Sequence, residues 1–103
     1  MRYPKDVPIL EAHHLCKGSY GTNDIHCLSG WMYEVFQDGL ARADASRAIK
    51  QVAGADRIVE FNDAPGRKLS FLAKTWNRAM AVLGYTEGNP EKAWVEKHEQ
   101  HRS

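Results

Sequence analysis

The stretch Phe61-Asn62-Asp63-Ala64-Pro65-Gly66-Arg67 stands directly before the most regular helical pattern in the chain. Its Asn-Asp pair, its proline and its glycine are residue types that form sharp turns. After the turn, apolar side chains recur at steps of three and four residues and so share one helix face: Leu69, Leu72, Trp76, Met80 and Leu83. We therefore predict a central packing helix over 68–83, which Gly84 ends and which the turn orients.

The other helical signals predict an all-α fold, a compact irregular bundle of about five helices. The expected bounds are 6–18, 22–39, 44–54 and 58–62 before the turn, and 89–98 after the central helix. Glycine follows or ends each of the first three segments, as is common at helix C-termini. The third begins at Asp44 or Ser46, and the last at Asn89-Pro90, a strong helix start. Residues 56–60 also fit a short extended stretch, but a short helix capped by Asn62 is favoured because no partner strand is evident.

The length and the charge of the chain limit the classes of protein to which it can belong. The chain of 103 residues predicts one domain over 1–103, with 99–103 as a frayed tail. Its 14 Lys and Arg against 13 Asp and Glu argue against a broad surface for binding nucleic-acid phosphates. No apolar run reaches the roughly 20 residues of a membrane span, and the N-terminus lacks the apolar core of a signal peptide. We therefore expect a cytoplasmic protein that does not bind membranes and whose cysteines are reduced.

Histidines and cysteines gather in the first third of the chain. The spacing of His13 and Cys16 places both on one face of a helix, and His26 or Cys27 could complete a metal site. Alternatively, Cys27 is a nucleophile activated by a helix N-terminus, with a histidine such as His26 as base. We favour a third interpretation, in which the cysteines are small buried apolar residues. The sequence thus predicts no catalytic residue, metal or cofactor.

The turn itself is a candidate binding site. Asn62, Asp63 and Arg67 could present polar groups to a ligand, or Asp63 could pair with Arg67 across the turn. We favour a structural role, in which Asn62 caps a helix, Asp63 accepts hydrogen bonds from turn amides, and Arg67 packs over Trp76 or Phe71. Among the aromatic residues, three tyrosines fit the apolar stripes less well and are candidates for partner contact: Tyr20, Tyr33 and Tyr85.

Two stretches together resemble a known group of proteins. His26-Cys27-Leu28-Ser29-Gly30-Trp31 and the 61–67 turn are similar to segments of a family of small, uncharacterised, bacterial and phage-borne helical proteins. That family has a Cys-Leu-x-Gly segment on one helix and a Trp-Asn-Asp-Ala-Pro-Gly-Arg-Thr turn before the next, and this chain has Phe61 as the aromatic residue of that turn. The likeness covers about residues 10–83. It implies a helical fold and a cytoplasmic setting but no reaction. This chain departs from the family at Lys68, where a capping threonine is usual.

The leading functional hypothesis is a module for protein–protein interaction or accessory binding, which works through another protein or a second copy in a homodimer. The first alternative is a small Cys/His enzyme or metal protein. The second is a nucleic-acid-associated regulator that uses a basic strip on the central helix: Arg67, Lys68, Lys74 and Arg78.

Overall fold

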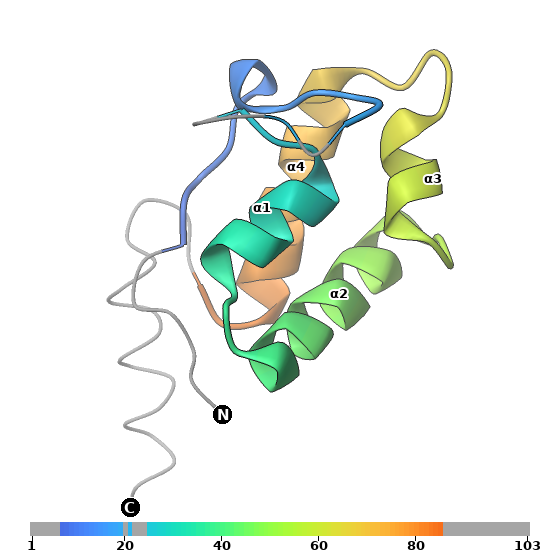
Figure 1. The fold of residues 1–103 in the computed structure, drawn as a ribbon. Coiled ribbons are helices and arrows are strands. Elements are labelled where there is room, and N and C mark those ends of the chain that lie inside the picture. The colour runs from blue at the N-terminus through green and yellow to red at the C-terminus, as the bar shows by residue number, and fades with distance from the viewer. Residues whose placement is uncertain (1–6, 20, 22–24, 86–103) are drawn as a thin grey trace, which may run out of the picture.

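The computed structural model describes residues 7–19, 21 and 25–85 (Figure 1). Within this part of the chain the fold is mostly helical, with four α-helices and one short 3-10 turn: η1 (Ala12–His14), α1 (Leu28–Val35), α2 (Gly39–Ala53), α3 (Ile58–Asp63) and α4 (Leu69–Val82). The all-α prediction is confirmed, and the expected count of about five helices is corrected to four in the described residues. The helix expected over 89–98 and the tail at 99–103 lie outside them.

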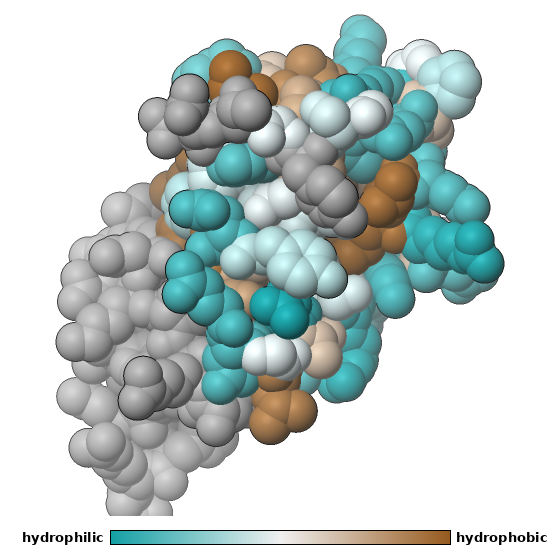
Figure 2. All heavy atoms as spheres, viewed as in Figure 1, coloured by the Kyte–Doolittle hydropathy of each residue, from teal (hydrophilic) through white to brown (hydrophobic). Residues whose placement is uncertain are grey.

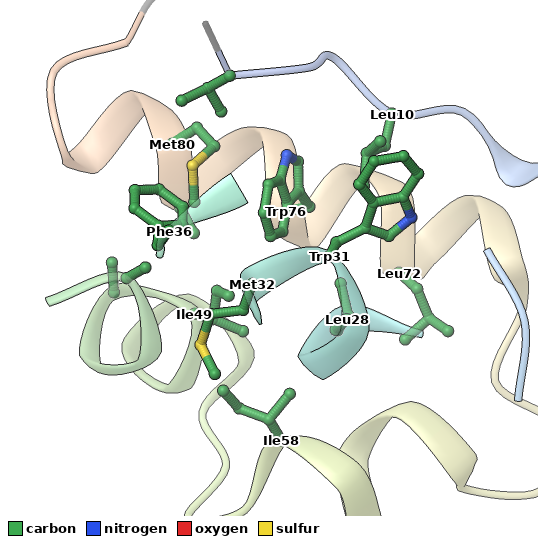
Figure 3. Close-up of a cluster of buried hydrophobic side chains, with 14 of the residues drawn as sticks. Leu10, Leu28, Trp31, Met32, Phe36, Ile49, Ile58, Leu72, Trp76 and Met80 are labelled. Carbon is green, nitrogen blue, oxygen red and sulfur yellow. The ribbon is translucent and has the colours of Figure 1, made fainter. Parts of the chain in front are cut away.

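Helix α4 is the central packing element, as its apolar stripe predicts. Trp76 and Leu72 are fully buried and Met80 nearly so. Figure 3 shows these side chains in one cluster with residues of other elements, including Leu28 of α1 and Ile49 of α2. A long apolar stripe at helical spacing places a helix in the core in this way.

Helix α2 lies against α4 in the most extensive helix pair of the described fold. Its buried face consists mainly of alanines, which let the two backbones approach closely: Ala41, Ala45 and Ala48. The predicted start at Asp44 or Ser46 is wrong, because Asp38 caps the helix by accepting hydrogen bonds from the amides of Leu40 and Ala41. Gly39 is therefore the first residue of α2 rather than the end of the preceding helix. The predicted end at Gly54 is confirmed by its left-handed φ of 66°.

Helix α1 is shorter than the sequence indicates. It begins at Leu28 and ends at Val35, whereas a helix over 22–39 was expected. Ile25 and His26 are extended, and His26 forms a parallel bridge with Leu15. The backbone of His26 is thus paired with residues 14–16 and is unavailable to a helix.

The predicted first helix over 6–18 is wrong. In its described part, residues 7–18, the chain is extended or turned except for η1. Asn77 explains this, because its side chain donates to the carbonyl of Leu10 and accepts from the amide of Leu10, both at 2.9 Å. Trp76 Nε1 also donates to the carbonyl of Pro8 at 3.0 Å. Side chains of α4 therefore satisfy backbone groups that a helix would otherwise pair.

Helix α3 confirms the preference for a short helix over an extended stretch. It runs from Ile58 to Asp63, and the turn that follows, with Gly66 at a φ of 79°, leads into α4. In Figure 1, α3 stands beside α1 at the edge of the bundle. None of the described helices combines the length and the apolar character that crossing a membrane requires.

Candidate binding surface around helix α1

Asn62 is the junction at which three segments meet. It lies on α3 with 1% of its surface exposed. Its Nδ2 donates to the carbonyl of Cys16 at 3.0 Å, and its Oδ1 accepts from the amide of Leu28 at 3.0 Å. One amide side chain thereby joins α3, the N-terminal segment and the start of α1. The predicted role of Asn62 as a cap of its own helix is wrong, since it satisfies the first amide of α1 instead.

Asp63 and Lys17 fasten the N-terminal segment to the same end of α3. Asp63 Oδ1 accepts from the amide of Gly18 at 2.9 Å and from Asn62 Nδ2 at 2.9 Å. These two hydrogen bonds lower the pKa of the Asp63 carboxyl, the one from Gly18 contributing most. Lys17 Nζ donates to the carbonyl of Ala64 at 2.9 Å. The carboxylate expected to accept turn amides thus accepts one from a distant segment.

Arg67 closes the turn on itself. Its Nη1 donates to the carbonyl of Phe61 at 2.7 Å, and its guanidinium lies 4.0 Å from the centre of the Phe61 ring. The expected packing over Trp76 or Phe71 is therefore corrected to Phe61. Since Asn62, Asp63 and Arg67 all bond to the protein's own backbone, their arrangement explains the turn and the junction.

The junction borders a cavity that also contains Cys27. The cavity has a volume of about 230 Å³ and is lined by residues from three segments: Gly18, Ser19, Cys27, Val59, Asn62 and Asp63. The fold thus brings together two candidates that the sequence kept separate, Cys27 and the Asn62-Asp63 pair. No spacing pattern could have revealed this, because the contacts join residues 34 to 46 positions apart.

Cys27 occupies the N-cap of α1, where its Sγ accepts from the amide of Gly30 at 3.3 Å. Only 6% of the residue is exposed. Burial raises the pKa of the Cys27 thiol, and the amides of Gly30 and Ser29 oppose this only in part. The alternative in which a helix N-terminus activates Cys27 requires a lowered pKa, but burial outweighs that effect, so the thiol is the dominant form at neutral pH.

The remaining histidine and cysteine candidates lie in different surroundings. His13 is exposed, with its Nδ1 3.4 Å from Glu11 Oε2. His26 packs edge-on against Trp31, with ring centres 4.8 Å apart. Cys16 and Cys27 are both free thiols. Among the described residues, no group of three or more His, Cys, Asp or Glu side chains is placed to hold a metal ion.

Beside the cavity, a wider concave surface follows α1. The α1–α3 groove, as we name it, has a volume of about 470 Å³ and is lined by residues of three helices and a loop: Ser29, Met32, Tyr33, Ser46, Lys50, Asp56, Arg57, Ile58, Val59 and Glu60. Val59 also lines the Cys27 cavity, so the two hollows adjoin. A third hollow of about 410 Å³ continues beyond Tyr33, toward His26 and Glu34. Tyr33 therefore stands between two concavities.

The other sequence candidates fall into place around this surface. Tyr33 is 54% exposed, whereas Tyr85 is buried in the core. Tyr20 lies outside the described residues. Lys68, at the N-cap of α4, and Lys74 and Arg78 on the helix are exposed. Arg67 is partly buried and bonded to Phe61. The sequence drew attention to Tyr33 but not to the groove, since Ser46 and Lys50 of α2 reach it only through helix packing.

Comparison of the chain with models of protein families, with curated proteins and with solved structures finds no match. The resemblance carried by Cys27-Leu28 and by the 61–67 turn stays a prediction.

Proposed function

We propose that this protein is a protein-interaction module that binds its partner in the α1–α3 groove. The observation that carries the proposal is the pair of half-exposed apolar side chains on the groove walls. Tyr33 is 54% exposed and Val59 is 50% exposed, and both line a hollow of about 470 Å³. Large apolar side chains left in solvent beside a concave surface are typical of binding sites.

The composition of the groove favours a protein partner. Its floor is apolar, with Met32 and Ile58 nearly buried. Its rim carries both signs of charge, with Lys50 and Arg57 opposed by acidic residues. Figure 2 shows hydrophobic atoms over α3 with hydrophilic atoms around them. An apolar centre within a polar rim is the usual anatomy of a non-obligate protein interface, whereas a nucleic-acid surface would carry an excess of cations.

Arg42 holds Tyr33 ready for contact. Its guanidinium lies 4.4 Å from the centre of the Tyr33 ring, and its Nη1 also donates to the carbonyl of Phe36 at 3.2 Å. The ring is thus restrained before any partner arrives, which reduces the entropy lost on binding. A restrained tyrosine is a common hot spot of interfaces.

The first testable prediction uses two valines in similar positions. Val59 of α3 lines the groove, and Val82 of α4 is 57% exposed but does not line it. The tagged full chain first captures its partner from the native host, and the affinity of the purified partner is then measured. We expect Val59→Gln to weaken binding about tenfold and Tyr33→Ala about 30-fold or more. Glutamine carries no charge, so placing it at Val59 of α3 or at Val82 of α4 adds no charge that would interact with the helix dipole.

Val82→Gln is the matched control and should bind like the unmodified protein. The proposal fails if Val82→Gln weakens binding as much as Val59→Gln, or if neither change has an effect. Sedimentation of the purified protein shows whether the partner is a second copy. Binding of duplex DNA that persists in Tyr33→Ala would instead favour the basic residues of α4.

A further inference from the structure

Cys16 and Cys27 occupy neighbouring positions on two paired segments. Leu15 and His26 form a parallel bridge, in which His26 donates to the carbonyl of His14 at 3.1 Å and Cys16 donates to the carbonyl of His26 at 3.3 Å. One step further along both segments, Cys16 comes opposite Cys27. Paired backbones lie about 5 Å apart, and a disulfide joins α-carbons about 4.4–6.8 Å apart. The spacing of the two segments therefore suits a disulfide.

Ser19 is a neighbour of both cysteines. Cys27 lines the cavity of about 230 Å³ together with Ser19. The Cys16 Sγ donates to the carbonyl of Ser19 at 3.6 Å. In addition, burial is the largest cause of the raised pKa of the Cys27 thiol, and a charge on Cys16 adds to it.

From this geometry we propose that Cys16 and Cys27 form a reversible intramolecular disulfide when the protein encounters hydrogen peroxide. Cys16 is the more exposed thiol and reacts first. The Cys16 thiol loses its proton, its thiolate sulfur attacks one oxygen of the peroxide, and the O–O bond breaks. A sulfenic acid and hydroxide result, and the hydroxide takes up the proton lost by Cys16 to become water. The deprotonated sulfur of Cys27 then attacks the Cys16 sulfur, the S–S bond forms, and the S–O bond breaks. Hydroxide leaves and takes up the proton lost by Cys27. In sum, two thiols lose two electrons and peroxide becomes two waters.

The disulfide joins the same two segments as the Asn62 side chain. That side chain already joins the two segments through the carbonyl of Cys16 and the amide of Leu28. A covalent bond between Cys16 and Cys27 holds the same segments together without Asn62. It also closes the chain between residues 16 and 27, which removes conformational freedom from the unfolded protein. Oxidation should therefore fix one wall of the cavity and stabilise the fold.

The test treats the reduced full chain with hydrogen peroxide and measures its intact mass. We expect the mass to fall by that of two hydrogen atoms and to return to its original value with a dithiol reductant. Trypsin cleaves after Lys17, between the two cysteines, so the oxidised protein should yield a linked pair of peptides, one ending at Lys17 and the other at Arg42. A gain of oxygen on Cys16 while Cys27 stays a thiol, or a disulfide between two copies, would overturn the proposal.

Single variants separate the roles of the two cysteines. In Cys27→Ser, peroxide should leave a sulfenic acid on Cys16 that a sulfenic-acid probe traps. In Cys16→Ser, the buried Cys27 should react much more slowly, and equal rates in the two variants would count against the proposed order.

Because Asn62→Ala removes the non-covalent tie, oxidation should raise the folding equilibrium constant of this variant about 100-fold. If Asn62→Ala does not fold, the mass and peptide measurements on the unmodified chain still decide the matter.

Discussion

The residue types of the 61–67 turn could be assigned from the sequence, whereas their partners could not. Pro65 and Gly66 are turn residues for reasons local to the backbone, whereas Asn62 bonds to the distant Cys16 and Leu28. The partner of Asp63, the amide of Gly18, is 45 positions away. No local propensity encodes such a pair. The sequence therefore predicted a structural turn correctly in kind, while the junction that Asn62 builds depends on how distant segments pack.

The charge of Asp63 gives a prediction at this scale. Hydrogen bonds from Gly18 and Asn62 lower its pKa below the ordinary value of 3.8, so folding favours the carboxylate. This contribution is present above the unfolded value and is lost as the pH falls through the lower folded value. We expect Asp63→Asn to melt at a lower temperature than the unmodified protein at neutral pH. The difference should shrink on acidification below 3.8. Melting curves across the pH range test this, and a difference that is independent of pH would contradict it.

Among the elements, α4 and the short α3 were predicted close to their observed bounds, whereas the starts of α1 and α2 were misplaced. Helix α4 was expected over 68–83 and is observed from Leu69 to Val82. Gly39 was interpreted as a stop, but Asp38 makes it a start. Glycine is compatible with both the start and the end of a helix, and only the capping hydrogen bonds distinguish the two.

The start of α4 gives a second prediction. Lys68 occupies the N-cap with extended φ and ψ of −76° and 144°, yet its side chain makes no capping hydrogen bond. A threonine there can accept from an amide of the first turn. We expect Lys68→Thr to stabilise the protein by about 1 kcal/mol in chemical denaturation.

Lys68→Ala is the matched control, because it removes the same positive charge from the helix N-terminus without adding a cap. Equal stabilities of the threonine and alanine variants would show that charge, rather than capping, limits this helix end.

For the molecule as a whole, the N-terminal segment is held in place by α4. Leu10 is buried, and both of its backbone groups bond to Asn77. The apolar pattern of residues 7–16 was compatible with a helix, and the competing side-chain partner could not be inferred from it. The α1–α3 groove could not be predicted from the sequence either, because it forms only when three helices pack together.

The hydrogen bonds that attach Leu10 to Asn77 give a third prediction. Asn77→Ala leaves the amide and carbonyl of Leu10 without their partners, which should cost about 2 kcal/mol in the free energy of unfolding. Hydrogen exchange at the Leu10 amide should become faster than in the unmodified protein. An amide that stays equally protected would show that burial alone holds residues 7–11 on α4.

The hydrogen bonds between Leu10 and Asn77 also determine when the N-terminal segment can bind to α4 during synthesis. The two residues are 67 positions apart, and Pro8 and Trp76 are 68 apart. When the ribosome has made the N-terminal segment, the side chains that will bind it have not yet been translated. This segment leaves the ribosome before α4 does, so it can take its final place only after α4 has emerged.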